Sequence, residues 1–217
     1  MIPDHYSPAN VIHNQAIGEH VHWLKLETEE EIRTQPGQFF MLRLSNPKGE
    51  LVERSYSIAN SSNRKIFEFV IRIESEGRMS RLIPQLKVGD KMDVKGPFGR
   101  FGEIPEGTKK IVFIAGGVGI APIRSIIQKL KGTFLIQLFY GFRTAQDFLF
   151  EEEFKSYGFE VVTNVGGYIS DSLEGKVFAP DLATHAFICG PPPMVKATRE
   201  KLFALGFDRN HVHVEAW

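Results

Sequence analysis

The sequence predicts a chain of two halves, a small antiparallel β-structure followed by a doubly wound parallel α/β sheet. Up to about residue 101, short β-rich runs are separated by turn signals, which is typical of a barrel or sandwich. Residues 110–115 are continuously apolar, as in a parallel strand covered on both faces. Strands then alternate with helical patterns to the end of the chain. We therefore expect two domains, residues 1–106 and residues 107–217.

The composition limits the kind of protein this can be. Of the 217 residues, 42% are hydrophobic and 24% are charged, which is typical of a globular protein, and the formal net charge is zero. This balance gives no signal for nucleic acid or membrane partners, and no apolar run is long enough to span a bilayer. A single cysteine excludes an internal disulfide and an iron–sulfur cluster held by this chain alone. Because no secretion signal is recognisable, we expect a cytoplasmic protein.

Turn signals divide the first half into short strands. The clearest strand is 66–73, in which every second side chain is apolar: Phe67, Phe69, Ile71 and Ile73. The other expected strands have a β-forming composition with less regular alternation. They are residues 20–27, 38–44, 53–59 and 91–95.

Residues 54–57, Arg-Ser-Tyr-Ser, combine three kinds of contact on one expected strand. Arg54 offers a planar fork of donors for a phosphate, Tyr56 offers a flat ring, and Ser57 offers a hydroxyl. Side chains alternate along a strand, so Arg54 and Tyr56 point the same way. A ligand with a phosphate at one end and an aromatic ring at the other, such as a flavin nucleotide, can contact both. The alternative is an ordinary strand with a solvated arginine and a core tyrosine.

Residues 77–80, Gly-Arg-Met-Ser, precede a short helical run at 81–86. A glycine followed by a serine at a helix N-terminus presents backbone N–H groups and a hydroxyl, which suit a pyrophosphate. The alternative is that Ser80 only caps the helix.

In the second half, the strand at 110–115 runs into residues 116–122, Gly-Gly-Val-Gly-Ile-Ala-Pro, and then into a helix at 123–131. Glycines at such a turn let backbone N–H groups approach a phosphate, and the helix dipole favours the anion. Pro122 fits the first turn of the helix. The spacing differs from the usual Gly-x-Gly-x-x-Gly pattern.

The remaining elements complete the predicted parallel sheet. Thr144 and Asp147 form a capping pair before a helix at 148–157, and a second helix follows Met194 and ends near residue 205. Ligands bind at the carboxyl ends of such strands, where the turn after Cys189 and the glycine turn both fall. His211 and His213 share a strand face, but no histidine has metal-ligand spacing and we expect no metal. The expected strands are 133–140, 159–163, 185–189 and 211–214.

Four segments in this order, 54–57, 77–80, 116–122 and 189–194, resemble the ferredoxin–NADP reductase superfamily over nearly the whole chain. The resemblance implies a six-stranded FAD-binding barrel and a C-terminal NAD(P)-binding domain. It implies that Arg54 holds the flavin pyrophosphate, that Tyr56 stacks on the flavin, and that Ser57 lies near its reactive nitrogen. The ending Glu215-Ala216-Trp217 resembles the plant-type terminus, whose aromatic residue covers the flavin. The alternative for Trp217 is a frayed terminus, or a tryptophan packed in a crystal or dimer contact.

The resemblance also implies roles for named residues. The expected catalytic residues are Ser57, Cys189, Glu215 and Trp217. The expected cofactor-binding residues are Arg54, Ser55, Tyr56, Ser57, Ile71, Arg72, Gly77, Arg78, Met79, Ser80, Gly116, Gly117, Gly119, Pro122, Arg143, Thr144, Cys189, Gly190, Pro191, Met194 and Trp217.

The expected activity is hydride transfer between NAD(P)H and FAD, followed by single-electron transfer to a separate carrier. The carrier is a ferredoxin, a flavodoxin or an oxygenase component. Arg143 and Thr144 suit a 2′-phosphate, which slightly favours NADPH over NADH. The alternatives are a free-flavin reductase, the reductase subunit of a larger complex, or a nucleotide-binding regulatory subunit without turnover.

Overall fold

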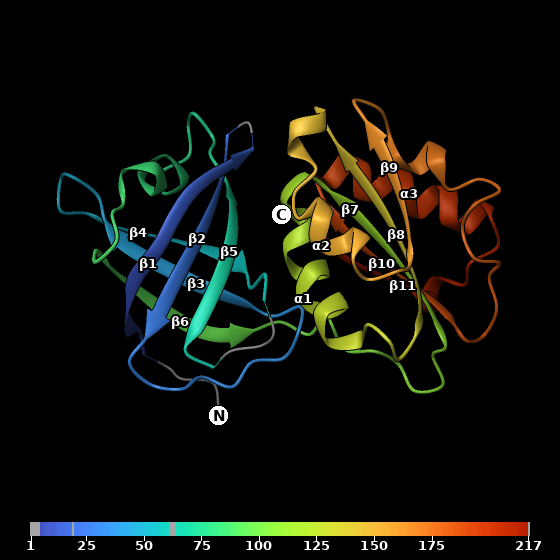
Figure 1. The fold of residues 1–217 in the computed structure, drawn as a ribbon, viewed down its shortest axis with the longest axis horizontal. Coiled ribbons are helices and arrows are strands. Elements are labelled where there is room, and N and C mark those ends of the chain that lie inside the picture. The colour runs from blue at the N-terminus through green and yellow to red at the C-terminus, as the bar shows by residue number, and fades with distance from the viewer. Residues whose placement is uncertain (1–4, 19, 61–63, 217) are drawn as a thin grey trace. The chain divides into compact units, whose positions relative to one another are not determined.

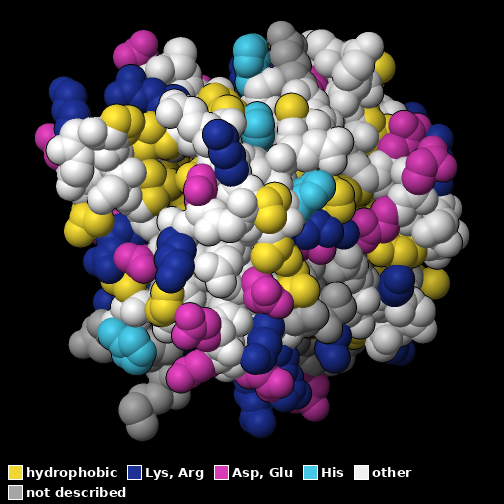
Figure 2. Space-filling view, turned by 60° about the vertical axis from the view of Figure 1, so that its left-hand side comes forward, with side chains coloured by type: hydrophobic (Ala, Val, Ile, Leu, Met, Phe, Trp, Pro, Cys, Tyr) yellow, Lys and Arg dark blue, Asp and Glu magenta, His cyan; other side chains and the backbone are white. Residues whose placement is uncertain are grey.

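A computed structural model describes residues 5–18, 20–60 and 64–216. The chain divides into two compact units. The first comprises Met1–Gly102 together with Arg124–Lys129, and the second comprises Glu103–Ile123 and Leu130–Trp217. On the face seen in Figure 2, basic and acidic side chains are interspersed, in keeping with the zero net charge.

The first unit is a six-stranded antiparallel sheet with the order β4-β3-β6-β1-β2-β5, which confirms the predicted architecture (Figure 1). The sequence did not predict strand β1, whose polar middle and two register shifts against β2 hide its alternation. The strands are β1 (Ser7–Gly18), β2 (Val21–Thr28), β3 (Phe39–Ser45), β4 (Leu51–Ser57), β5 (Ile66–Arg72) and β6 (Lys91–Phe98).

The segment after β4 closes this sheet onto β5. The Ala59 N–H donates to the Glu68 carbonyl at 2.7 Å. The Asn60 side chain accepts from the Glu68 N–H at 3.0 Å and donates to the Ile66 carbonyl at 2.9 Å. The interior holds the predicted face of β5, where Phe67, Phe69 and Ile71 are buried. The sheet therefore encloses one apolar core and carries the 54–57 motif on the strand next to its closure.

The second unit is a five-stranded parallel sheet with the order β11-β10-β7-β8-β9. One face packs with α3 and a 3₁₀ turn at Ile169–Ser172 around a buried apolar cluster. The strands are β7 (Lys110–Gly116), β8 (Leu135–Phe142), β9 (Glu160–Val165), β10 (Thr184–Gly190) and β11 (Val212–Ala216). The α-helices are α1 (Ile120–Leu130), α2 (Glu151–Lys155) and α3 (Pro192–Ala204). In the described part of the chain, no helix is long and apolar enough to cross a membrane.

The helix expected at 148–157 is confirmed only over Glu151–Lys155, and its predicted start and end are wrong. Thr144 and Asp147 do form the predicted capping pair, but they close a 3₁₀ turn at Ala145–Asp147. Phe148 then leaves the helical path to stack on Phe142 at a centroid distance of 5.2 Å. Aromatic packing in the core therefore overrides the local helical pattern at this position.

Three histidines meet where β10 and β11 begin. His185 Nδ1 lies 3.1 Å from His213 Nε2, and the rings of His185 and His211 are 4.3 Å apart. His211 is the last residue of a 3₁₀ turn, and β11 begins only at Val212. The prediction that His211 belongs to the strand is therefore wrong. Burial, followed by the nearby His211 and His213, lowers the pKa of His185 to about 4. Among the described residues, no cluster of side chains is arranged to hold a metal ion.

We expect acid to destabilise the second unit through His185. In the unfolded chain the pKa returns to about 6.5, so only the unfolded state gains the proton as the pH falls. Between pH 7 and pH 5 this lowers the free energy of unfolding by about 2 kcal/mol. Urea unfolding of the wild type and of His185→Phe measures the difference, with the exposed His5→Gln as control. Equal losses in the wild type and in His185→Phe would contradict the assignment.

Candidate functional site

The first group of site residues lies on β4. Val52, Arg54 and Tyr56 share one face of this strand. Val52 is buried in the core and Tyr56 packs against it, whereas Arg54 is exposed and donates from Nη1 to the Glu53 carbonyl at 2.9 Å. Burial raises the pKa of Tyr56 to about 12, and the positive charge of Arg54 partly opposes this rise. The motif therefore presents a neutral phenol ring and a nearby guanidinium on one side of the strand.

The turn at 77–80 is a second candidate phosphate cradle. A Cβ atom on Gly77 would lie 2.1 Å from Ser80 Oγ, so any other residue here would displace the Ser80 hydroxyl. Ser80 Oγ accepts from the Glu74 N–H at 3.1 Å and does not cap the 3₁₀ helix Ser80–Gln85, whose N-cap is Met79. The capping alternative for Ser80 is therefore wrong, and its hydroxyl instead braces the turn.

The neighbours of this turn differ in what they can offer a ligand. The side chains of Ile71 and Met79 are buried in the core, so only their backbone atoms can reach a cofactor. Arg78 is exposed, and Arg72 Nε forms an ion pair with Glu74 Oε1 at 2.8 Å. Of these predicted residues, Arg78 has the side chain most accessible to a phosphate.

In the second unit, the glycine turn (residues 116–122) lies beside the carboxyl end of β10. A Cβ atom on Gly119 would lie 2.3 Å from the Cys189 carbonyl oxygen. A Cβ atom on Gly116 would lie 2.3 Å from Met194 Sδ. Strands β7 and β10 are neighbours from which the chain winds in opposite directions, the point at which such sheets bind ligands. Gly190 belongs to the same close contact, since its Cβ would meet Met194.

Tyr140 links the glycine turn to the loop after β8. Its hydroxyl donates to the Gly117 carbonyl at 3.0 Å and lies 3.4 Å from the Asp147 carbonyl. The side chain is fully buried, and this burial raises its pKa far above the ordinary value. Sequence reasoning placed Tyr140 in a strand and missed this role, because both partners are reached only in the folded sheet.

The loop after β8 carries an acidic group that the sequence reading treated only as a cap. Asp147 Oδ2 accepts from the Thr144 N–H at 3.3 Å and from Thr144 Oγ1 at 3.0 Å. Arg143 is exposed beside it. Residues 143 and 144, expected to bind a 2′-phosphate, therefore lie next to a carboxylate.

The predicted residues at the end of the sheet come together in part. Cys189 is fully buried and pairs in register with Glu215 across β10 and β11. Pro191 is the N-cap of α3. Pro122 lies in the first turn of α1, as expected. Trp217, the expected cover of the flavin, lies outside the described residues.

Two protein families match this chain. Residues 8–102 match the family described as "Oxidoreductase FAD-binding domain". Residues 113–165 match the family described as "Oxidoreductase NAD-binding domain". The first match covers the antiparallel unit with the 54–57 motif, and the second covers the glycine turn and the loop after β8.

Individual relatives agree with these matches. NADH-cytochrome b5 reductase 1 of Dictyostelium discoideum is 31% identical over 211 residues, covering 86% of this chain and 73% of the relative. The glycine betaine monooxygenase reductase subunit of Chromohalobacter salexigens is 30% identical, and the match covers 84% of this chain but only 56% of the relative. The solved structure of the ferredoxin reductase in carbazole 1,9a-dioxygenase has a TM-score of 0.87 at 29% identity, covering 99% of this chain and 70% of the other.

Proposed function

This chain belongs to the ferredoxin–NADP reductase superfamily of oxidoreductases that bind FAD and a nicotinamide dinucleotide, and from that premise we propose its particular reaction. It takes a hydride from NAD(P)H and passes electrons to a separate carrier protein. Residues 1–106 hold FAD and residues 107–217 hold the dinucleotide. The observation that carries this proposal is the pairing of Arg54 and Tyr56 on one face of β4.

The described residues fit both cofactors. The guanidinium of Arg54 and the ring of Tyr56 match the phosphate and the aromatic ring of a flavin nucleotide. The turn in which Gly77 packs against the Ser80 hydroxyl adds a second cradle for the pyrophosphate. In the second unit, Gly119 packs closely on the Cys189 backbone and so holds the glycine turn at the carboxyl end of β10, where such sheets bind a pyrophosphate.

Each residue has a defined task in this reaction. Bound FAD supplies the chemistry that accepts a hydride and releases single electrons. Arg54 neutralises the pyrophosphate, and Tyr56 remains an uncharged phenol whose ring supports the flavin. Ser57 offers a hydroxyl next to that ring. Cys189 and Glu215, paired across two strand ends, border the nicotinamide and orient it.

Three classes of carrier protein could accept the electrons: a ferredoxin, a flavodoxin and an oxygenase component. We favour an oxygenase component or its ferredoxin, because two relatives are named as reductases of oxygenase systems. The single cysteine in these 217 residues cannot ligate an iron–sulfur cluster alone, so we propose that the electrons pass to a redox centre held outside this sequence.

Anaerobic mixing of the purified protein with NADH tests the proposed function. We expect a yellow protein with bound FAD that bleaches on mixing and recovers its colour when a carrier accepts electrons. A colourless protein that takes up no FAD would favour the regulatory subunit. Reoxidation by free flavin but by no carrier would favour a free-flavin reductase.

We further propose that NADH is preferred over NADPH, which reverses the slight preference expected from the sequence. Asp147 suits a ribose 2′-hydroxyl and repels a 2′-phosphate. Asp147→Asn keeps an acceptor for Thr144 and removes the charge. We expect the ratio of kcat/KM for NADH to kcat/KM for NADPH to exceed 10 in the wild type and to fall about tenfold in the variant.

Glu152→Gln is the control for this experiment, because it removes one negative charge from a side chain that is 90% exposed on α2. It should leave the coenzyme ratio unchanged. A wild type that prefers NADPH, or a variant with the wild-type ratio, would contradict the role of Asp147.

A further inference from the structure

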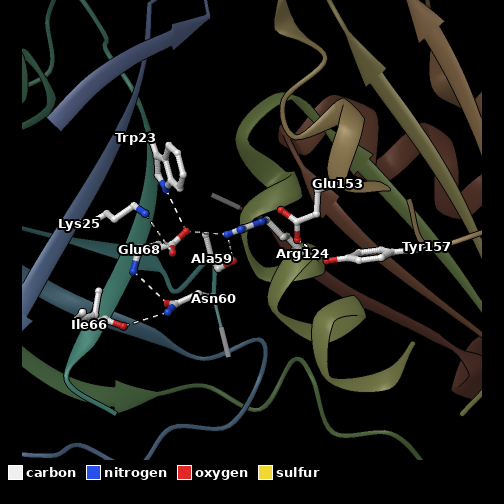
Figure 3. A network of polar contacts seen from close by, with 9 residues as sticks. All are labelled: Trp23, Lys25, Ala59, Asn60, Ile66, Glu68, Arg124, Glu153 and Tyr157. Carbon is white, nitrogen blue, oxygen red and sulfur yellow. Dashed lines mark hydrogen bonds and ion pairs between the residues drawn. The ribbon is translucent and has the colours of Figure 1, made fainter. Parts of the chain in front are cut away.

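Arg124 makes polar contacts that neither the glycine turn nor the flavin motif explains. The segment Arg124–Lys129 of α1 belongs to the first unit. Arg124 is only 7% exposed, and its Nη1 donates to the Ala59 carbonyl and to Glu68 Oε2, both at 2.8 Å (Figure 3). One guanidinium therefore binds the segment that follows β4 and a carboxylate on β5.

Glu68 receives further donors on the same carboxylate. Trp23 Nε1 donates to Oε2 at 3.1 Å, and Lys25 Nζ lies 3.7 Å from Oε1. Figure 3 shows Trp23, Lys25 and Arg124 all pointing toward this group. The side chain of Glu68 is 14% exposed. A carboxylate held by Trp23 and Lys25 as well as by Arg124 keeps the guanidinium in one place.

This ion pair is not needed to close the barrel. The backbone bond between Ala59 and Glu68 and the Asn60 side chain already join the end of β4 to β5. A buried ion pair stabilises a fold little compared with apolar packing of the same volume, and its best-attested use is to fix one arrangement among several. The arrangement that Arg124 fixes is the place of α1 against the segment after β4.

Both ends of this contact lie next to proposed site residues. Ala59 is two positions after Ser57, and Arg124 is two positions after Pro122, the last residue of the glycine turn. An α-helix rises about 1.5 Å per residue and is stiff over one turn, so a fixed Arg124 also fixes the start of α1. The glycine turn leads directly into that start.

We propose that Arg124, held by Glu68, is a positioning residue for hydride transfer. It touches neither cofactor. It holds the start of α1, and with it the glycine turn, in one place, so that a bound dinucleotide is presented in one orientation. This inference rests on the proposed function, since it needs both cofactors to react.

Arg124→Met tests the inference, because it keeps the length of the side chain and removes its donors. We expect the limiting rate of anaerobic flavin bleaching by NADH to fall at least tenfold, with FAD content unchanged and the NADH concentration for half-maximal rate within threefold of wild type. The limiting rate of Arg124→Lys should lie between those of Arg124→Met and the wild type. Arg43→Met is the matched control, since it removes the Arg43–Asp93 ion pair at 2.9 Å elsewhere on the barrel.

A second readout does not depend on activity. Amide hydrogen exchange in the apoprotein should accelerate at least tenfold in residues 58–60 and 116–123 of Arg124→Met, and should stay unchanged in β3. If Arg124→Met fails to retain FAD, Glu68→Gln is tested in its place, because the amide keeps the shape of the carboxylate. We then expect a limiting rate in Glu68→Gln at least threefold lower than in the wild type.

Three outcomes would overturn the inference. They are a limiting rate within twofold of wild type in the FAD-loaded variant, an equal loss in Arg43→Met, and unchanged exchange in residues 116–123. A wild type that NADH does not bleach would instead refute the proposed function and leave the exchange experiment as the test of the Arg124 contact.

Discussion

Replacing Gly119 with alanine is expected to lower the rate of flavin reduction by NADH at least 100-fold while leaving FAD bound. The new Cβ atom would lie 2.3 Å from the Cys189 carbonyl oxygen and 2.6 Å from its carbonyl carbon, closer than real Cβ contacts. Both atoms belong to the backbone of β10, which is paired on both sides by β11 and β7, and they cannot turn away as a side chain can. The glycine turn must therefore move, and the N–H groups at the start of α1, which we propose bind the dinucleotide phosphate, move with it.

Gly116→Ala is the matched control for this prediction. Its Cβ would meet Met194 Sδ at 2.3 Å, but the end of a methionine side chain can swing aside. We expect a loss of tenfold or less in this variant. Stopped-flow bleaching with NADH and the FAD absorbance of the purified variants provide the measurements. A rate of flavin reduction in Gly119→Ala equal to that of the wild type would show that the turn does not hold the dinucleotide.

The fold could be predicted because its main signals are local. The unbroken apolar run of β7 reflects a strand buried on both faces, and the alternation of β5 reflects a strand buried on one face. Each pattern predicted the correct type of strand. Strand β1 escaped because its register shifts break the period of two. The helix expected at 148–157 begins later than predicted, and Phe148 instead packs on Phe142, a contact that local periodicity cannot show.

The candidate site divides in the same way. Arg54 and Tyr56 could be paired from sequence, because strand alternation alone puts them on one face. Tyr140 and Arg124 could not, since their partners lie 23 and 56 residues away along the chain. The one local signal for Arg124 is a charged residue within a run of buried isoleucines, which requires a partner somewhere in the fold. Sequence alone cannot name that partner.

Replacing Arg54 with methionine is expected to weaken FAD binding roughly 100-fold. A charge-assisted hydrogen bond is worth about 1.5–3 kcal/mol, and a guanidinium can make two such bonds to a pyrophosphate. The structure leaves the donors available, because Arg54 is exposed and spends one N–H on the Glu53 carbonyl. Methionine has a stem of similar length and leaves Tyr56 unchanged, so ring stacking should survive. Quenching of FAD fluorescence on titration with apoprotein gives the dissociation constant.

Arg64→Met is the control, since Arg64 forms an exposed ion pair with Glu31 and is not on β4. It should leave FAD affinity within twofold of wild type. The dependence on ionic strength separates two explanations of a weaker affinity in Arg54→Met. If Arg54 pairs with the pyrophosphate, salt should weaken FAD binding to the wild type more than to the variant, because salt screens that attraction. If both proteins respond equally, the contribution of Arg54 is packing, and the charge of the pyrophosphate must be met by Arg78 and the turn at 77–80.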